Sequence, residues 1–424
     1  MATVAERPTL AEVARLDDPA FYASEPHDVF ARLRTEAPVF WCEGTAFWAV
    51  SRYEDARHVL RHPELFSSEG DLQLESWVNH PGAALFRFRD EDPIPPEHAL
   101  QLISVDKPVH TQYRKMVLKT GMFGVRATPD IELGLRPVIA ARLAEVAGSA
   151  GELDELVSAP LATAAVGELL GLSPELHSKL RIWGETVEPL AGADSSEARA
   201  QAAVAMEEMW HEVVAFMGSG AREDRAICRL RDAQRETEAV DVDSVVAFIC
   251  DLIVAGVEAL RTTLTGATVA LAQHPAEWNR VQADMSLMPN LVEELLRWVT
   301  SGSSIGRVAY ADTEIAGQRI ARGDRVLVLF MSANRDETVW EHADRFDAGR
   351  DLRPGHLAFG LGTHLCVGAE LSRTVLRTYL EELAASGMQF GLGGTPRRRP
   401  GFNATAQFAS APIAFSPTSE HREA

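Results

Sequence analysis

The stretch that decides the fold spans residues 359–368 and reads Phe359-Gly360-Leu361-Gly362-Thr363-His364-Leu365-Cys366-Val367-Gly368. It presents one cysteine, Cys366, at the end of a glycine-rich loop. Glycine lets a backbone turn tightly and approach a flat group closely, where a Cβ atom would collide with it. The amphipathic run from Ala369 to Leu383 follows directly. We therefore expect Cys366 at the N-terminus of a helix, where the helix dipole and free amides favour a thiolate.

Three other readings of this loop compete. A dinucleotide-binding loop would need a third glycine at position 365, which is leucine. A zinc site would need further ligands at short spacing, and the sequence contains no Cys-x-x-Cys pair. A purely structural glycine turn would not need the cysteine.

The pattern Phe-Gly-x-Gly-x-His-x-Cys-x-Gly resembles the signature of the cytochrome P-450 family of haem-thiolate monooxygenases, in its soluble bacterial form. The resemblance implies a mainly α fold with small β-sheets, a triangular prism around a buried haem b (iron protoporphyrin IX). It implies that Cys366 is the axial ligand of the iron, and that Phe359, Gly360 and Gly368 contact the haem. A thiolate ligand pushes electron density to the iron and favours O–O cleavage.

The whole chain fits one globular unit. Its 424 residues include 46% hydrophobic residues and show no Pro/Ser/Gly-rich linker, so we expect a single domain over residues 1–424, with 1–20 as a loosely ordered extension. We find neither a signal-peptide pattern nor an apolar run of about twenty residues, which predicts a cytoplasmic protein that does not enter membranes. The net charge of -20 argues against nucleic acid and anionic membranes as partners.

Helical periodicity dominates the chain, and strand-like segments are few. We expect helices over Asp28–Glu36, Asp55–Leu60, Ile131–Val146, Ala198–Met217, Ser244–Gln273 and Asn290–Val299, and strands over Phe47–Val50, Arg307–Tyr310, Thr313–Ile315 and Arg325–Phe330, with a terminal hairpin near Phe402–Phe415.

A second motif of the resemblance is Glu294-Leu295-Leu296-Arg297. Residues three apart share one face of a helix, so Glu294 and Arg297 can pair and hold a third group. In the family this group is an arginine before the cysteine loop, and Arg345 is the candidate. The role is structural, because the triad would lock the cysteine loop.

Cations are also needed to hold the two haem propionates, which would otherwise be buried, unpaired anions. The stretch 106–114 resembles the family's Asp-x-Pro-x-His-x-x-x-Arg, with His110 and Arg114 one helical turn apart. Arg307 and His364 fall where the family supplies further propionate donors.

The long helix departs from the family pattern at one position. Members usually read Ala-Gly-x-Asp/Glu-Thr-Thr, in which glycine leaves an oxygen-binding groove and the acid and the alcohol relay protons. Gly256 and Glu258 match, but Ala259 stands where threonine is expected. The resemblance therefore implies protons arriving through ordered water or through a group of the substrate.

Two nearby threonines do not restore the missing hydroxyl. From ideal helix geometry, Thr262 is turned roughly 60° from Ala259 and Thr263 roughly 40°, and both lie about 4.5–6 Å further along. Glu258 also faces an alternative role, because it can form an ion pair with Arg261 three residues later.

Four segments would line the substrate pocket by family analogy, namely 69–102, 253–261, 299–306 and 402–406. The segment 299–306 is rich in small polar residues. It either offers hydroxyl groups to a substrate or is a flexible turn.

The resemblance implies O2 and a small hydrophobic organic molecule as substrates, hydroxylation or O-dealkylation as the reaction, and a ferredoxin as electron donor. Arg114, Lys115, Lys119, Arg373 and Arg377 are the basic positions where a ferredoxin would dock. Alternatives are peroxide-driven or substrate-assisted oxidation, oxidative coupling in natural-product biosynthesis, aromatic O-demethylation and, last, a non-catalytic haem-binding interaction domain.

Overall fold

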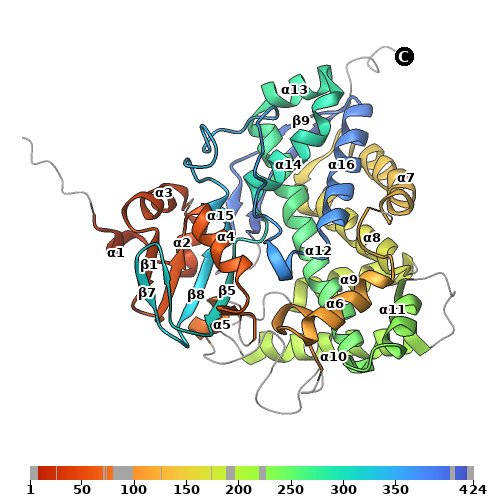
Figure 1. Cartoon of the computed structure of the whole chain (residues 1–424). Helices are drawn as coiled ribbons and strands as arrows, with labels where there is room; N and C mark the ends of the chain where they lie inside the picture. Colours follow the sequence, from red (N-terminus) through yellow and green to blue (C-terminus); the bar gives the residue numbers. More distant parts are fainter. Residues whose placement is uncertain are drawn as a thin grey trace, which may run out of the picture.

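The structure is a computed structural model, and it describes residues 8–24, 26–69, 72, 74–79, 99–125, 127–172, 174–187, 196–218, 226–401 and 406–417. These residues form a mainly α molecule with small sheets (Figure 1), as the sequence predicts. No helix among them is both long and apolar enough to cross a bilayer.

The helices include every predicted one, each to within three residues at either end. They are α1 (Leu10–Val13), α2 (Pro19–Ala23), α3 (His27–Glu36), α4 (Tyr53–Arg61), α5 (Leu74–Asn79), α6 (Val109–Lys119), α7 (Thr128–Val146), α8 (Ala159–Leu170), α9 (Pro174–Val187), α10 (Ser196–Gly218), α11 (Ala226–Arg235), α12 (Val242–Gln273), α13 (Pro275–Ala283), α14 (Met288–Val299), α15 (Phe330–Ala333) and α16 (Ala369–Ala385).

The largest sheet has the strand order β1-β2-β8-β5-β3, in which only β2 and β8 are parallel among the described strands. Its members are β1 (Val39–Cys42), β2 (Phe47–Val50), β3 (Phe66–Ser67), β5 (Ser304–Ala309) and β8 (Arg325–Leu329). The smaller sheets pair β6 (Thr313–Ile315) with β7 (Gln318–Ile320), β10 (Arg397–Arg398) with β11 (Phe408–Ser410), and β12 (Pro412–Ser416) with both β4 (Ala150–Glu152) and β9 (Gln389–Leu392).

The predicted terminal hairpin is wrong. The strands β11 and β12 follow one another in the chain but belong to different sheets. Glu152 explains the break, because its carboxylate accepts hydrogen bonds from Ser410 Oγ at 2.9 Å and Ala411 N at 2.7 Å. Those bonds turn the chain away from β11 and onto β4.

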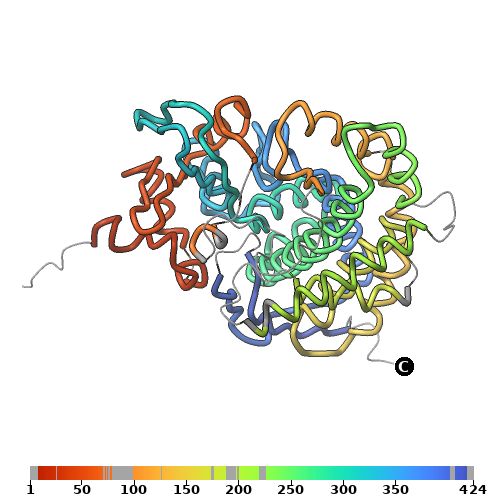
Figure 2. The backbone as a smooth tube through the Cα atoms, turned by 90° about the horizontal axis from the view of Figure 1, so that it is seen from below, coloured from red at the N-terminus to blue at the C-terminus, as the bar shows by residue number. Residues whose placement is uncertain are grey.

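The helix α12 runs through the middle of the molecule, between the large sheet and the helices α8 and α16 (Figures 1 and 2). Its N-terminus is capped by Asp241, whose carboxylate accepts from Ser244 N at 2.7 Å. Fifteen of its 32 residues belong to the largest apolar cluster, together with residues of α7, α8, α10 and α16. A helix this apolar on most sides is typical of a protein core.

From residue 8 onward, the described part of the predicted extension 1–20 packs against the rest of the molecule. Leu16 is fully buried in the apolar cluster that includes Phe21, Phe30 and Leu33. Tyr22 donates a hydrogen bond to the Leu16 carbonyl at 2.9 Å. The sequence offered no periodic signal for this packing, and residues 1–7 lie outside the described part.

Candidate active site

The cysteine loop is fixed by backbone contacts. Cys366 N donates to the Phe359 carbonyl at 3.0 Å, and Leu365 N donates to Gly362 at 3.2 Å, so the loop closes on itself. Gly362 has a φ of +76°, and a Cβ there would approach the Leu60 carbonyl oxygen to 2.5 Å. Glycine is therefore required at that position for both conformation and space. The helix α16 begins three residues after Cys366, as predicted.

The Cys366 thiol is accessible yet deep within the molecule. Burial raises its pKa, while the Gly368 backbone N–H, Arg114 and Arg373 act to lower it. The Gly368 N–H therefore acts in the direction expected of a helix terminus, and burial opposes it. A bound metal cation would supply the missing stabilisation, because a coordinating thiol is deprotonated by its metal.

Four cationic or imidazole side chains gather near this loop from α6, β5 and the loop itself. The rings of His110 and His364 lie 4.2 Å apart, and His364 Nε2 is 3.9 Å from Asp106 Oδ1. Burial, His364 and Arg114 lower the pKa of His110 to about 4. Burial also lowers the pKa of Arg307 to about 10, against the opposing effect of Asp106.

This donor set fits a haem with carboxylate side groups. His110 Nε2 and His364 Nε2 are buried and have no hydrogen-bond partner within the described residues. Buried nitrogens of this kind are costly unless they are paired, and two carboxylates would pair them. A single accessible thiol beside such nitrogens is the chemistry of a haem-thiolate site.

The predicted pair of Glu294 and Arg297 is present and completely buried. The carboxylate accepts from Arg297 Nε at 2.7 Å and from Arg297 Nη2 at 2.8 Å, and both side chains are 0% exposed. Glu294 also accepts from Asp347 N at 3.0 Å. The pair thus ties α14 to the segment that leads to the cysteine loop.

The prediction of Arg345 as the third member is wrong. The arginine beside Glu294 is Arg350, whose Nε lies 3.2 Å from Glu294 Oε1. Arg345 is exposed, and it contributes its backbone carbonyl, which accepts from Arg297 at 3.4 Å and from Arg350. The segment 341–350 curls around the Arg350 guanidinium, which donates to the backbone carbonyls of Glu341, His342 and Arg345.

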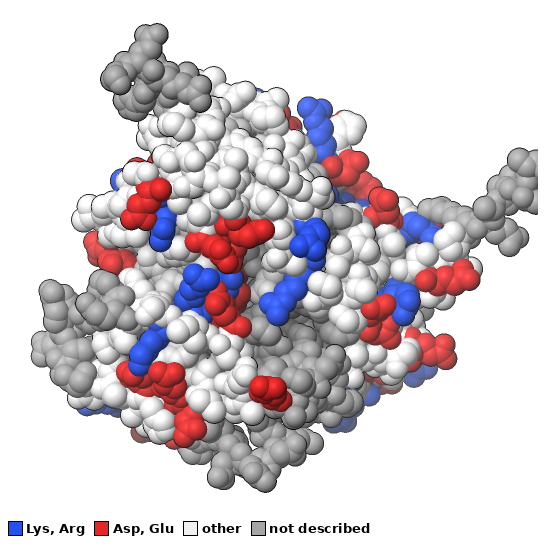
Figure 3. Space-filling model, turned by 180° about the vertical axis from the view of Figure 1, so that it is seen from behind, with Lys and Arg blue, Asp and Glu red and all other residues white. Residues whose placement is uncertain are grey.

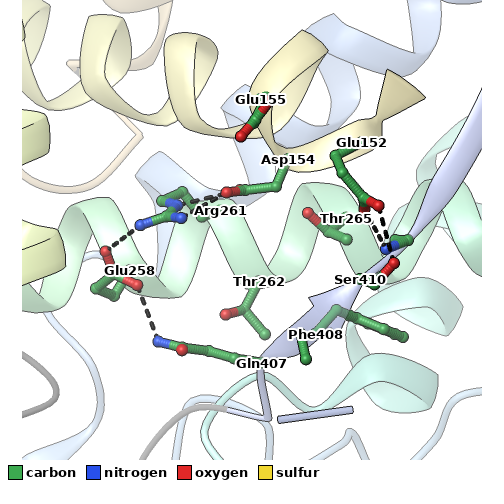
Figure 4. A pocket seen from close by; sticks show the side chains of 12 residues that line it. Glu152, Asp154, Glu155, Glu258, Arg261, Thr262, Thr265, Gln407, Phe408 and Ser410 are labelled. Atoms are coloured by element: carbon green, nitrogen blue, oxygen red, sulfur yellow. Dashed lines mark hydrogen bonds and ion pairs between the residues drawn. The ribbon is translucent and has the colours of Figure 1, made fainter. Parts of the chain in front are cut away.

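Glu258 is buried on α12 and forms the ion pair that was the alternative to a proton-transfer role. Arg261 Nη1 lies 2.7 Å from Glu258 Oε1, and Arg261 also pairs with Asp154 at 2.5 Å. Gln407 Nε2 donates to the other Glu258 oxygen at 2.9 Å (Figure 4). The carboxylate is therefore held from two sides by groups outside the cysteine loop.

These groups line a polar cavity of about 130 Å³ (Figure 4). Its walls come from β4 and the turn after it, from α12, and from β11. The lining residues are Glu152, Asp154, Glu155, Glu258, Arg261, Thr262, Thr265 and residues 407–411. Glu258 thus lies between this cavity and the interior of the molecule.

The other predicted residues of α12 take up separate positions. Gly256 faces α8, where a Cβ would meet Val166 Cγ2 at 3.2 Å. Ala259 is partly accessible and has no hydroxyl to offer. Thr263 Oγ1 donates to the Ala259 carbonyl at 2.7 Å, and Thr262 lines the polar cavity. Neither threonine takes the position of the missing alcohol.

Two of the predicted pocket segments fall mainly outside the described residues, namely 70–71, 73 and 80–98 of the first segment and 402–405 of the last. In the segment 299–306, the Thr300 hydroxyl donates to the Arg297 carbonyl at 2.7 Å and accepts from Asn334 at 2.9 Å. Ser304 already begins β5. The Thr300 hydroxyl therefore stabilises the turn after α14.

The predicted basic surface is largely neutralised by neighbouring acids. Arg373 pairs with Glu293 at 2.7 Å, Arg377 pairs with Glu132 at 2.7 Å, and Lys119 pairs with Glu236. Lys115 is exposed. On the face opposite to that of Figure 1, acidic and basic side chains are likewise interspersed (Figure 3).

The sequence analysis did not predict the contacts of Arg350 with Glu294 or of Gln407 with Glu258. Gln407 lies 149 residues from Glu258 and belongs to no motif. The segment between Asp344 and Asp351 contains two arginines, Arg345 and Arg350, so the sequence did indicate Arg350 as a second candidate. Nothing in the local sequence decides which of the two turns inward.

Comparisons with known proteins agree on one family. The model of the family "Cytochrome P450" matches residues 197–383. Linalool 8-monooxygenase of Pseudomonas putida is 33% identical over 405 residues, covering 90% of this chain and 94% of the relative. Steroid C26-monooxygenase of Rhodococcus jostii (strain RHA1) is 30% identical, covering 93% and 83%.

Solved structures show the same architecture. Cytochrome P450-153 from Novosphingobium aromaticivorans has a TM-score of 0.82 at 28% identity and covers 96% of this chain and 100% of that chain. Mycobacterium marinum CYP268A2, solved in complex with pseudoionone, has a TM-score of 0.80 at 26% identity and covers 98% and 100%.

Proposed function

The chain belongs to the cytochrome P450 family and is an oxidoreductase of the monooxygenase type, and we propose that it inserts one oxygen atom from O2 into a small, largely hydrophobic organic molecule by hydroxylation or O-dealkylation. The observation that carries the proposal is the accessible thiol of Cys366 beside two buried histidines without hydrogen-bond partners in the described structure. We treat residues 1–424 as one catalytic domain.

The residues present would hold a haem b. Cys366 would bind the iron, and His110, Arg114, Arg307 and His364 would hold the propionates, with Phe359, Gly360 and Gly368 against the haem. When bound, the haem supplies oxygen activation and accepts the electrons that the reaction consumes. Glu294, Arg297 and Arg350 keep the loop before Cys366 in place through their buried bonds.

Proton supply on α12 does not follow the usual acid and alcohol pair. Ala259 offers no hydroxyl, and the Glu258 carboxylate is engaged by Arg261 and Gln407. Protons would reach the reacting oxygen through ordered water or through a polar group of the substrate. Glu258 takes part only when it leaves one of these partners, because general acid–base catalysis requires reach as well as a suitable pKa.

The named relatives support the substrate class. Linalool 8-monooxygenase and steroid C26-monooxygenase act, by their names, on linalool and on steroids. We extend from them only the class of small hydrophobic molecule to this chain. A ferredoxin of the cytoplasm would deliver the electrons, with the exposed Lys115 as the docking position for which no ion pair is described above.

An optical titration of the purified ferric protein tests the proposal. The panel contains methoxylated benzenes, terpenoids, steroids and macrolactones. A shift from low to high spin with one group shows displacement of iron-bound water and names the substrate class. Absence of a haem band, or a band that survives Cys366→Ala unchanged, contradicts the proposal.

Peroxide-driven oxygenation is a second candidate, which the alanine at position 259 favours. Peroxide brings its own protons and electrons, so the relay that this chain lacks is not needed. Turnover with ferredoxin and reductase, compared with turnover on peroxide alone, separates the two. Product from peroxide alone at the higher rate establishes the second candidate.

A further inference from the structure

Five residues of α12 form a strip that the apolar core does not cover. Every residue from 244 to 260 outside this strip is buried, whereas the strip is accessible to different degrees. At about 100° per residue, its members fall within about 140° of the helix surface. The strip consists of Asp251, Leu252, Ala255, Gly256 and Ala259.

Asp251 is the unexpected member of this strip. Burial raises its pKa well above the usual value, and no cation or hydrogen bond opposes that effect. No partner for its carboxyl group is found among the described residues. A carboxyl group that protein atoms crowd but do not pair calls for an explanation.

The strip includes Gly256 and Ala259, which stand at the positions that the family resemblance assigns to oxygen activation. The end of α12 that carries Asp251 packs against α6, because Tyr113 donates to the Ser244 carbonyl and its ring lies 6.0 Å from that of Phe248, one helical turn before Asp251. Tyr113 stands between His110 and Arg114, and the Asp251 charge contributes to its raised pKa.

The rest of the strip is small and apolar. Ala255 and Ala259 present small, accessible side chains, and Leu252 adds an apolar contact. A purely hydrocarbon ligand would cover this surface but would leave Asp251 without a partner. A ligand with one polar end would satisfy both parts of the strip.

We propose, on the basis of the proposed function, that Asp251 is the polar anchor of the substrate. Its carboxyl group forms a hydrogen bond with a hydroxyl or amine group at one end of an otherwise aliphatic molecule. The hydrocarbon part then lies along Leu252, Ala255 and Ala259, which brings the far end of the substrate toward the haem iron. Asp251 thus selects the substrate and sets which carbon is oxidised.

Three probes with one skeleton test the anchor: a cyclic monoterpene hydrocarbon, its alcohol and its tertiary amine. Dissociation constants come from calorimetry and from the spin shift of the ferric protein. We expect the wild type to bind one polar probe at least about tenfold more tightly than the hydrocarbon. Asp251→Leu should abolish this preference, and the same exchange at the exposed Asp130 should leave it unchanged.

Asp251→Asn identifies the polar group, because asparagine keeps hydrogen bonding and loses the charge. If Asp251→Asn still binds the alcohol more tightly than the hydrocarbon, the polar group of the substrate is a hydroxyl. If Asp251→Asn loses a preference of the wild type for the amine, the polar group is a cation. Equal preference in the wild type and Asp251→Leu overturns the proposal, as does failure of the wild type to favour either polar probe.

Thermal unfolding without any ligand gives an independent readout. If Asp251 has no structural partner, Asp251→Leu should raise the melting temperature, because an uncompensated carboxyl group is replaced by an apolar one of similar size. A lower melting temperature would mean that the carboxyl group supports the fold, which also overturns the proposal. A missing haem band, in contrast, would contradict the proposed function and leave this readout valid.

Discussion

Replacing Arg350 by alanine should destabilise the protein strongly, while Arg345→Ala should not. Arg350 donates to Glu294 at 3.2 Å, to the Glu341 carbonyl at 2.7 Å and to the His342 carbonyl at 2.9 Å. The substitution leaves the fully buried Glu294 with one cation fewer and these carbonyls without their donor. Breaking a buried ion pair and its hydrogen bonds costs about 3–5 kcal/mol.

The expected shift in melting temperature follows from the size of the chain. With roughly 2.1 cal/mol/K of unfolding entropy per residue over 424 residues, that loss lowers the melting temperature by roughly 3–6 °C. Arg345→Ala removes an exposed side chain and keeps the backbone carbonyl that Arg350 uses, so we expect a change within about 0.5 kcal/mol.

Calorimetry of the two variants side by side, both loaded with haem, measures the difference. Equal losses of stability, or a larger loss for Arg345→Ala, would refute the assignment of Arg350 as the partner of Glu294. Circular dichroism of each variant at low temperature checks that both are folded before heating.

Three further predictions concern stability at acidic pH, the rate of reduction by ferredoxin, and the product formed per electron consumed. Burial acts to raise the pKa of Glu293, but hydrogen bonds from His356 and Arg373 lower it to about 2. The stability that this carboxylate contributes is therefore present above about pH 4.5 and is lost as the pH falls toward 2. Glu293→Gln should flatten that acid limb by on the order of 1–3 kcal/mol in denaturant titrations, and an unchanged limb would contradict the assignment. Lys115→Glu should slow reduction by ferredoxin at low salt more than Lys119→Glu, because Glu236 already offsets Lys119; equal rates for wild type and both variants in stopped-flow experiments would remove the proposed docking site. Ala259→Thr should not raise the product formed per electron consumed, and a marked rise would show that the native proton route is a poor relay.

Local patterns predicted the mainly α fold class and several of its longest helices. The glycine loop with its cysteine and the helices α7, α12, α14 and α16 follow from residues close together in the sequence, where periodicity and turn chemistry act directly. The pair Glu294 and Arg297 also lies within one helical turn. Each of these predictions needed no knowledge of the rest of the chain.

Contacts between distant segments were beyond such patterns. The choice of Arg350 over Arg345 depends on how the segment 341–350 curls, which its packing on α14 decides. The break between β11 and β12 depends on Glu152, which lies 258 residues before Ser410. The ion pair of Glu258 with Arg261 was foreseen as an alternative, whereas its bond to Gln407 was not.

The sheet that joins β12 to β4 and β9 has a consequence for the order of folding. Pro412 pairs with Glu152, which lies 260 residues earlier in the chain. Closing so long a loop costs conformational entropy before the contact can stabilise the molecule. We therefore expect this sheet, and the contact of Gln407 with Glu258, to form late, after the helices between them have folded. A chain shortened to end before residue 406 would keep Cys366 and α12 but would lose the wall that these strands add beside Glu258.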